Sequence, residues 1–376
     1  MTALRPLIDA EGITIGTAKS APGSYAYGEF RALDLPSGGT EVFPVVIAQG
    51  EQPGPILWVT GGIHGDEYTA LGIIQRLLTP ELPKQISGAV VFIPTLNPAG
   101  LRVGERYAYY QKRQDPNRLF PEPRHTPPAE DEDSLHLLEG AYARLFEVIK
   151  ATASALIDFH NYSIQSIPFV FRDPVYYFKD DESDKGAAQT LWNQTEALIQ
   201  AFGFTAINEF ASRSYLRKSL HRSVSGAALQ VGRIPAFTAE MGGYLTIDPI
   251  IADAAAAGTR NVMRQMGILG GARETLTGIT PLALDYSVRR TQAIHVPHTG
   301  IVRFLIRPGV FLRVGDPVAV LTDIWGRPLT SEAGVICADE EGYVIGLSQG
   351  AAFYEGEHLV SLAIRDESNP VLLYPD

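Results

Sequence analysis

Four short apolar runs, each ending in polar residues, constrain the fold of this chain most strongly. They are PILWVTGG (55–62), GAVVFIPTLNP (88–98), SALIDFH (154–160) and IPAFTAEMGG (234–243). Strands buried on both faces form continuous apolar runs, and such strands are typical of parallel sheets covered by helices. Segments with helical periodicity, LWNQTEALIQAF (191–202) and DPIIADAAAAGTRNVMRQM (248–266), accompany them. The alternation predicts an α/β fold with a mixed, mostly parallel central sheet flanked by helices.

The pattern of the chain changes near residue 286. From there on, short alternating strands are separated by glycine turns, and no helical period is found. We therefore expect residues 1–285 to form a large α/β domain, with edge strands in 1–50, and residues 286–376 to form a small all-β, barrel-like domain. Its glycine-rich sequence is similar to lipoyl and biotinyl carrier barrels, which carry a modified lysine. Because no lysine follows Lys218, a swinging-arm carrier is excluded.

Composition and charge exclude several classes of protein. The formal net charge of -11 argues against a nucleic-acid partner, since binding to phosphates needs clustered lysine and arginine. No apolar run approaches the roughly 18 residues of a membrane span, so we expect no membrane partner. The first residues lack a basic segment followed by an apolar one, and Cys337 is the single cysteine. These features favour a cytoplasmic protein without internal disulfides.

A histidine and a glutamate three residues apart follow the first apolar run. In GGIHGDEYTALGIIQRLL (61–78), His64 and Glu67 stand between that run and a stretch with helical periodicity. The same spacing recurs in HLLE (136–139), inside an ordinary amphipathic helix. Only the first copy lies at the end of a predicted strand, so we interpret the second as helix surface.

Three further polar residues, Asn97, His160 and Glu240, stand just past the ends of other predicted strands. Ligands of such sheets bind beyond the carboxyl ends of the strands. A hydrolytic zinc site commonly has two histidines and one carboxylate, and keeps a position open for water. His160 is therefore the best candidate for a third ligand, the alternative being a buried structural histidine. Asp158 either orients this histidine or is a simple acid at the sheet edge.

Two histidines of the C-terminal region, His295 and His298 in HVPH, could form a second metal pair. Strand alternation and the intervening proline favour a structural role for both.

Five short motifs stand in the order of a known family. They are H-G-x-E (64–67), N-P followed by R-Y (97–98 and 106–107), D-x-N-R (115–118), D-x-H-N (158–161) and A-E-M-G-G (239–243). In this order they resemble the succinylglutamate desuccinylase and aspartoacylase family of the zinc carboxypeptidase-like superfamily. The resemblance covers roughly residues 50–270 by motif, and the family's small C-terminal β domain corresponds to residues 286–365. It implies that residues 1–285 form a zinc carboxypeptidase-like catalytic domain.

The resemblance also implies a role for individual residues. It places one zinc ion per chain on His64, Glu67 and His160, assigns Arg106 to polarising the scissile carbonyl, Asn117 and Arg118 to gripping a substrate carboxylate, and Glu240 to acting as the catalytic carboxylate. This chemistry is consistent with the residue types, because amide hydrolysis needs a polarised carbonyl and a carboxylate that moves the proton of water. The alternative for Glu240 is a buried acid paired with an arginine.

The D-x-N-R motif differs from that of relatives at one position, where this chain has Pro116 and they tend to have leucine. Proline fixes φ, so the backbone geometry of the Asn117–Arg118 anchor stays open. The motif lies in a long segment, residues 104–128, which we expect to be a functional loop.

We therefore expect a zinc-dependent amidohydrolase that removes an acyl group from an N-acyl amino acid or a related small amide. A zinc carboxypeptidase acting on peptides is the first alternative, although a β domain capping the site would favour small substrates. The second is a non-catalytic binding protein on the same fold, against which the complete set of ligands argues. A homo-oligomer is left open.

Overall fold

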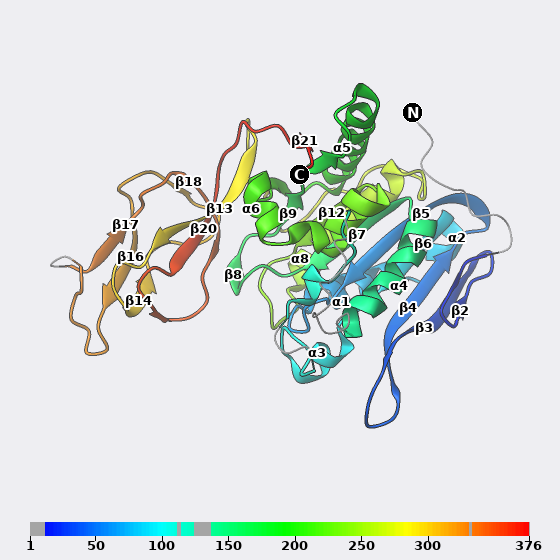
Figure 1. The fold of residues 1–376 in the computed structure, drawn as a ribbon, viewed down its shortest axis with the longest axis horizontal. Coiled ribbons are helices and arrows are strands. Elements are labelled where there is room, and N and C mark those ends of the chain that lie inside the picture. Colours follow the sequence, from blue (N-terminus) through cyan, green and yellow to red (C-terminus); the bar gives the residue numbers. More distant parts are fainter. Residues whose placement is uncertain (1–11, 111–113, 124–136, 331–332, 376) are drawn as a thin grey trace.

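A large mixed β-sheet forms the centre of the structure, a computed structural model that describes residues 12–110, 114–123, 137–330 and 333–375. The order of its strands is β15 (Phe311–Leu312), β18 (Gly342–Leu347), β20 (His358–Arg365), β13 (Val288–His295), β11 (Thr205–Asn208), β9 (Phe169–Arg172), β12 (Ala236–Glu240), β7 (Ala155–His160), β5 (Gln52–Gly61), β6 (Ser87–Ile93), β4 (Thr40–Gln49) and β3 (Ser24–Asp34), with β8 (Gln165–Ser166) paired to β18 (Figure 1). The neighbours β6, β5, β7 and β12 are parallel, whereas β9 runs antiparallel to β12. The predicted α/β fold is confirmed.

The four apolar runs of the sequence are the four parallel strands, and both faces of these strands are buried. In β5, Ile56 and Trp58 belong to one hydrophobic cluster, and Leu57 and Val59 belong to another. Successive side chains of a strand point to opposite faces of the sheet. A strand with a core on each side therefore needs apolar residues at every position, which explains the continuous runs.

Helices cover both faces of this part of the sheet (Figure 1). α4 (Leu137–Thr152) packs on one face, and α1 (Thr69–Leu77) and α8 (Pro249–Gln265) pack on the other. α5 (Glu182–Phe202) contributes residues to the hydrophobic clusters of both faces. Asp248 caps the start of α8, where it accepts hydrogen bonds from the backbone N–H groups of Ile250 and Ile251 at 2.9 and 3.1 Å. α5 ends at Gly203, whose φ of 86° is the left-handed conformation that glycine favours.

Short helices complete this region. They are α2 (Leu82–Gln85), α3 (Pro98–Val103), α6 (Ser212–Arg217), α7 (Val224–Ala227), the 3-10 turns η1 (Pro116–Arg118) and η2 (Leu220–Arg222), and the π-helical turn η3 (Ala228–Gly232). Of the second H-x-x-E copy, His136 lies outside the described residues, and Glu139 on α4 forms an ion pair with Arg222. Among the helices that the structure describes, none combines the length and the apolar character that a bilayer crossing requires.

The C-terminal strands continue the main sheet and add a second one. β13 joins β11 through a single parallel register pair, Asn208 with Arg289, and β20 and β18 follow. A separate sheet has the order β17 (Val335–Cys337), β16 (Pro317–Thr322), β14 (Gly300–Phe304) and β19 (Ala352–Phe353). One hydrophobic cluster joins the two sets of strands. The predicted β-rich C-terminal region is thus confirmed, whereas a domain boundary at residue 286 stays a prediction.

The end of the chain returns to the helix-covered part of the molecule. β21 (Val371–Leu373) pairs in parallel with β10 (Val175–Tyr177), with Val371 opposite Val175. Figure 1 shows this strand beside α5, away from the other C-terminal strands. The β-rich unit is therefore attached to the rest of the chain at both of its ends.

Candidate metal centre and active site

The three predicted zinc ligands come together at the carboxyl ends of two neighbouring parallel strands. His64 and Glu67 lie in the turn between β5 and α1, and His160 is the last residue of β7. All three are buried, and their potential ligand atoms lie within 4.8 Å of one another. In the described ranges of the chain this is the one such group of three or more residues, and neither His295 nor His298 belongs to it.

Each imidazole has one ring nitrogen directed at Glu67 and the other at an aspartate. The Nδ1 atoms of His64 and His160 lie 2.8 Å from Glu67 Oε1 and Oε2, respectively. The Nε2 atoms lie 3.0 Å from Asp115 Oδ1 and 2.8 Å from Asp158 Oδ2. A proton on Nε2, donated to the carboxylate, leaves the Nδ1 lone pair for a metal. The donor set thus fits zinc, and the contact between Asp158 and His160 is the one that the orienting alternative predicts.

Close packing of glycines shapes the turn that carries the first two of these residues. Gly62 has a φ of 59°, and a Cβ added to Gly65 would lie 2.1 Å from the carbonyl carbon of Gly100. The backbone N–H of Gly65 donates to the carbonyl oxygen of Arg106 at 3.2 Å. Any larger residue would push the turn away from the segment after α3, which positions Arg106.

Arg106 is held between two carboxylates of the site. Its Nη1 lies 3.1 Å from Glu67 Oε1, and its Nη2 lies 3.3 Å from Asp115 Oδ2. Burial opposes the charge of Arg106, but Glu67 and Asp115 raise the pKa of the guanidinium above its usual value. Asn97 caps α3 and donates to the carbonyl oxygen of Arg106 at 3.2 Å, so it supports this arginine from behind.

The D-x-N-R motif forms the 3-10 turn η1, and this geometry settles the effect of its proline. Asp115 is the N-cap residue, accepting from the N–H of Asn117 at 2.9 Å, and Pro116 occupies the first position of the turn. Proline suits that position because its missing N–H would have no partner there. Burial acts to raise the pKa of Asp115, but the hydrogen bond from His64, with His64, Arg118 and Arg106 nearby, holds it well below its usual range.

The two predicted anchor residues have different surroundings. Asn117 is buried, with Nδ2 3.3 Å from His160 Nε2 and with Oδ1 accepting from the N–H of Val224 at 3.0 Å. Arg118 donates through Nε to the carbonyl oxygen of Lys218 at 2.9 Å and through Nη1 to that of Asn117 at 2.6 Å. Its remaining nitrogen, Nη2, lies 3.9 Å from Asp115 Oδ2. The side chain of Arg118 is thus fixed, with donor capacity left over.

Glu240 is the last residue of β12 and lies beside His160 in the register of the two parallel strands. It is 8% exposed, and its Oε2 has no hydrogen-bond partner among the residues that the structure describes. Burial is the main reason that the pKa of Glu240 rises to about 7, and the charge of Glu67 adds to it. A carboxyl with a pKa near neutrality is suited to accept and return a proton.

All the predicted site residues line one cavity of ≈ 140 Å³. It contains His64, Glu67, Arg106, Asn117, Arg118, His160 and Glu240. Asp173, Glu209 and Arg290 also line it, the last of them from the β-rich C-terminal unit. Sequence reasoning missed these three, and assigned no role to Asp115. The general need of a ligand histidine for a carboxylate partner could have indicated Asp115.

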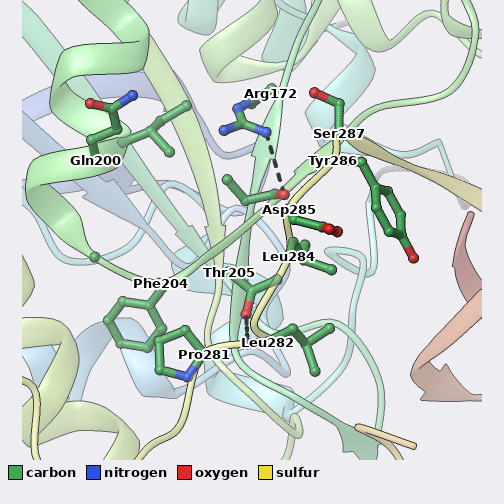
Figure 2. Close-up of a pocket in the computed structure, with 13 residues that line it drawn as sticks. Arg172, Gln200, Phe204, Thr205, Pro281, Leu282, Leu284, Asp285, Tyr286 and Ser287 are labelled. Carbon is green, nitrogen blue, oxygen red and sulfur yellow. Dashed lines mark hydrogen bonds between the residues drawn. The ribbon is translucent and has the colours of Figure 1, made fainter. Parts of the chain in front are cut away.

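A second cavity, of ≈ 520 Å³, is larger but contains none of these residues. It lies between the end of α5, β11 and residues 281–287 (Figure 2). Its arginine, Arg172, is already bound by Glu196 at 2.7 and 2.8 Å and lies 3.4 Å from the carbonyl oxygen of Ala206. The chemical groups of an active site are therefore in the smaller cavity.

Comparisons with known proteins agree with this location. The model of the succinylglutamate desuccinylase/aspartoacylase catalytic domain matches residues 53–266, which include every predicted site residue. A curated protein, the N-alpha-acetyl-L-2,4-diaminobutyric acid deacetylase of Halomonas elongata, is 35% identical over 69 residues. That alignment spans 18% of this chain and 20% of the deacetylase.

Solved structures share the fold over almost the whole chain. A succinylglutamate desuccinylase/aspartoacylase from Rhodobacter sphaeroides has a TM-score of 0.69 at 20% identity, covering 92% of this chain and 96% of that one. The product-bound ectoine utilization protein EutE (DoeB) from Ruegeria pomeroyi has a TM-score of 0.66 at 18% identity, covering 91% and 95%. Both coverages leave out less than a tenth of this chain, so they include at least part of the C-terminal β-rich region.

Proposed function

Because the chain belongs to the succinylglutamate desuccinylase/aspartoacylase family, we propose that it is a zinc-dependent hydrolase of the amide bond in an N-acyl amino acid or a related small N-acylated amine. One observation carries the proposal. Two buried imidazoles, each in contact with an aspartate, present Nδ1 to Glu67, and beside them lies Glu240, whose Oε2 has no hydrogen-bond partner among the described residues. This arrangement supplies a metal site and a free carboxylate in one cavity.

The metal ligands in this proposal are His64, Glu67 and His160, with one zinc ion per chain. The bound ion would polarise the substrate carbonyl and lower the pKa of water toward neutrality. Asp115 and Asp158 hold the imidazoles in the tautomer that binds metal, so they are positioning residues.

Glu240 acts in the proposal as the residue that moves the proton. A carboxylate with an unpartnered oxygen accepts a proton from the attacking water, and a pKa of about 7 lets it return that proton to the leaving nitrogen. An amide nitrogen is a poor leaving group unless it is protonated, so the second transfer is as necessary as the first.

The two arginines are proposed to bind the carbonyl oxygen of the scissile amide and the carboxylate of the substrate. Arg106 lies against the metal ligand Glu67 and would donate to the carbonyl oxygen, where negative charge develops during attack. Asn117 and Arg118 would bind the carboxylate of the amino acid. Oδ1 of Asn117 already accepts from Val224, so this side chain would contribute through Nδ2 alone, and the remaining donors would come from Arg118.

The two alternative functions are a peptide carboxypeptidase and a non-catalytic binding protein. A cavity of ≈ 140 Å³, lined in part by Arg290 from the C-terminal unit, favours a small amide over a peptide chain. The unpartnered oxygen of Glu240 next to a complete ligand set favours catalysis over binding alone. A cytoplasmic location and a homo-oligomer stay predictions.

The test combines metal analysis with a panel of substrates. The zinc-loaded protein is assayed against N-acyl amino acids with acetyl, succinyl and longer acyl groups, and against dipeptides. We expect about one zinc per chain and release of an amino acid from at least one N-acyl substrate. His160→Ala should lose both, whereas the matched variant His295→Ala should keep both. Undiminished zinc in His160→Ala, or hydrolysis of peptides only, would overturn the proposal.

A further inference from the structure

The proposed carboxylate anchor, Arg118, is held by a segment that lies 100 residues further along the chain. Arg118 Nε donates to the carbonyl oxygen of Lys218 at 2.9 Å. The N–H of Phe120 donates to the carbonyl oxygen of Arg222 at 3.1 Å, and Arg222 Nε donates to that of Phe120 at 3.1 Å. The position of the anchor therefore depends on the position of residues 218–222.

This segment contains a residue in an unfavourable backbone conformation. Ser219 has a φ of 52°, a left-handed conformation that residues other than glycine rarely adopt. Because Ser219 directly follows Lys218, a relaxation of its φ would turn the carbonyl group that binds Arg118. A backbone conformation of this kind persists only where the surrounding structure holds it in place.

A small hydrophobic cluster holds the segment on both sides of this residue. Tyr215 of α6 and Leu220 of η2 are 0% and 7% exposed, and both belong to the cluster together with Tyr176 of β10. The rings of Tyr176 and Tyr215 lie 6.3 Å apart, and the Tyr176 hydroxyl lies 2.7 Å from Oγ of Ser212, the first residue of α6. Leu220 also lines the active-site cavity. The cluster thus connects β10 to the residues that hold the anchor.

The strand β21 completes this cluster from the other end of the chain. Leu372 of β21, and Tyr374 just after it, pack against the cluster. The ring of Tyr374 lies 5.3 Å from that of Tyr176 and 5.3 Å from that of Phe178. Leu373 is 43% exposed, since alternate side chains of a strand point to opposite sides. Two side chains of three consecutive residues therefore support the cluster, and the one between them does not.

We propose that Tyr374 and Leu372 are positioning residues for the substrate anchor. By packing against the cluster, they keep Lys218 where its carbonyl oxygen holds Arg118. Neither residue lines the active-site cavity, so their effect reaches the substrate through residues 215–220. This inference rests on the proposed function, because it concerns the residue that would bind the substrate carboxylate.

The alternative is that these two side chains only stabilise the fold. The two possibilities differ in steady-state kinetics. An anchor binds the carboxylate equally in the ground state and in the transition state, so its displacement mainly raises KM. A loss of folded protein instead lowers the apparent kcat on every substrate and leaves the KM of the remaining molecules unchanged.

The test uses the most active N-acyl amino acid of the panel above and the same compound with its carboxylate replaced by a carboxamide. In Tyr374→Ala, KM for the carboxylate substrate should rise about 5- to 20-fold, part of the roughly 10- to 100-fold effect of losing a hydrogen bond to a charged group. KM for the carboxamide should change by less than about threefold. The zinc content and kcat should stay near those of the wild type, because the metal ligands come from β7 and the turn after β5.

A double variant tests whether the effect passes through Arg118. Substitutions that act on one shared interaction have non-additive effects. In the Arg118→Ala background, Tyr374→Ala should therefore raise KM by less than about twofold. If Tyr374 acts independently of the anchor, the same rise in KM as in the single variant would appear.

Three single variants separate this packing from other effects of the substitution. Tyr374→Phe keeps the ring, so KM should stay within about twofold of the wild type. Leu373→Ala is the matched control, because it shortens an exposed side chain of the same strand, and KM should again be unaffected. Leu372→Ala should repeat the effect of Tyr374→Ala, and it decides by the same criteria if Tyr374→Ala does not fold.

The outcomes distinguish this inference from the proposed function. An unchanged KM in both Tyr374→Ala and Leu372→Ala, an equal loss on both substrates, or a full further rise of KM in the Arg118→Ala background would overturn the positioning role while leaving the hydrolase intact. Absence of hydrolysis of every N-acyl amino acid in the panel would instead overturn the proposed function, and this inference with it.

Discussion

Replacing Asp158 with asparagine tests whether the tautomer of His160 controls metal binding. The carboxylate accepts from His160 Nε2 at 2.8 Å and from the hydroxyl of Thr60 at 2.7 Å. In Asp158→Asn, one orientation of the amide places its oxygen at Thr60 and its NH₂ group at His160 Nε2. The oxygen then still accepts the hydrogen bond from Thr60. Nε2 must then accept, and the proton moves to Nδ1, where the metal would bind.

The contacts of Asp158 set the size of the effect. The side chains of Asp158 and His160 are 0% and 3% exposed, so water does not replace a lost hydrogen bond. A hydrogen bond to a charged partner contributes about 1.5 to 3 kcal/mol. We therefore expect zinc affinity to fall about 10- to 100-fold. A loss of about 10-fold is expected if the new amide takes the opposite orientation, in which its NH₂ group donates to Thr60 and its oxygen still accepts from His160 Nε2.

Zinc affinity is measured by competition with a chromophoric chelator at fixed pH, for the wild type, for Asp158→Asn and for Asp173→Asn. The last is a matched control, because it makes the same change on another buried acid of the cavity that does not contact a ligand histidine. It should keep its zinc affinity within about threefold. If Asp158→Asn binds zinc as tightly as the wild type, the orienting role assigned to this aspartate is wrong.

Three further predictions follow from the site. Glu240→Gln should keep its zinc, because the change is nearly isosteric, yet lose turnover by about 100-fold or more, and a near-normal kcat would place the base elsewhere. Arg106→Ala should mainly lower kcat, by about 100-fold, whereas Arg118→Ala should mainly raise KM; steady-state kinetics showing the same defect in both would contradict the separate roles. The pKa of Asp173 is raised from 3.8 to about 7, so its ionisation weakens the fold as pH rises from about 4 through 7. Asp173→Asn should thus have the higher Tm at pH 8 and lose this advantage near pH 4, and a constant difference in Tm would argue against a buried, titrating carboxyl.

The clustering of the three predicted ligands could be predicted from the sequence because the carboxyl ends of neighbouring parallel strands lie at the same edge of the sheet. His64, Glu67 and His160 each follow an apolar run, and Glu240 ends the strand next to that of His160. The place of such a residue depends only on the order and direction of the strands, so the pattern of apolar runs is enough to predict which residues lie together. Family motifs supplied the roles, which the arrangement now makes testable.

Contacts between segments far apart in the sequence could not be predicted in the same way. Asp115 reaches His64 through a short 3-10 turn, and Arg290 reaches the cavity from a strand beyond the expected domain boundary. The strand β9, which turns Phe171 toward the arginine, is only four residues long and runs against its neighbour β12. The direction of β9 and the strands that pair with it are set by packing, so the pattern of apolar residues in the sequence does not reveal them.

The return of the chain at β21 affects the order in which the active site is assembled during synthesis. Arg290 reaches the cavity from β13, Ser361 of β20 lies 2.9 Å from the hydroxyl of Tyr162, and Val371 pairs with Val175. These contacts join residues of the α/β part to residues that are made later in translation, and such long-range contacts form slowly. His64, Glu67, His160 and Glu240 all belong to segments that are made before Arg290. A nascent chain should therefore bring these four residues together while the side of the cavity that Arg290 lines is still open.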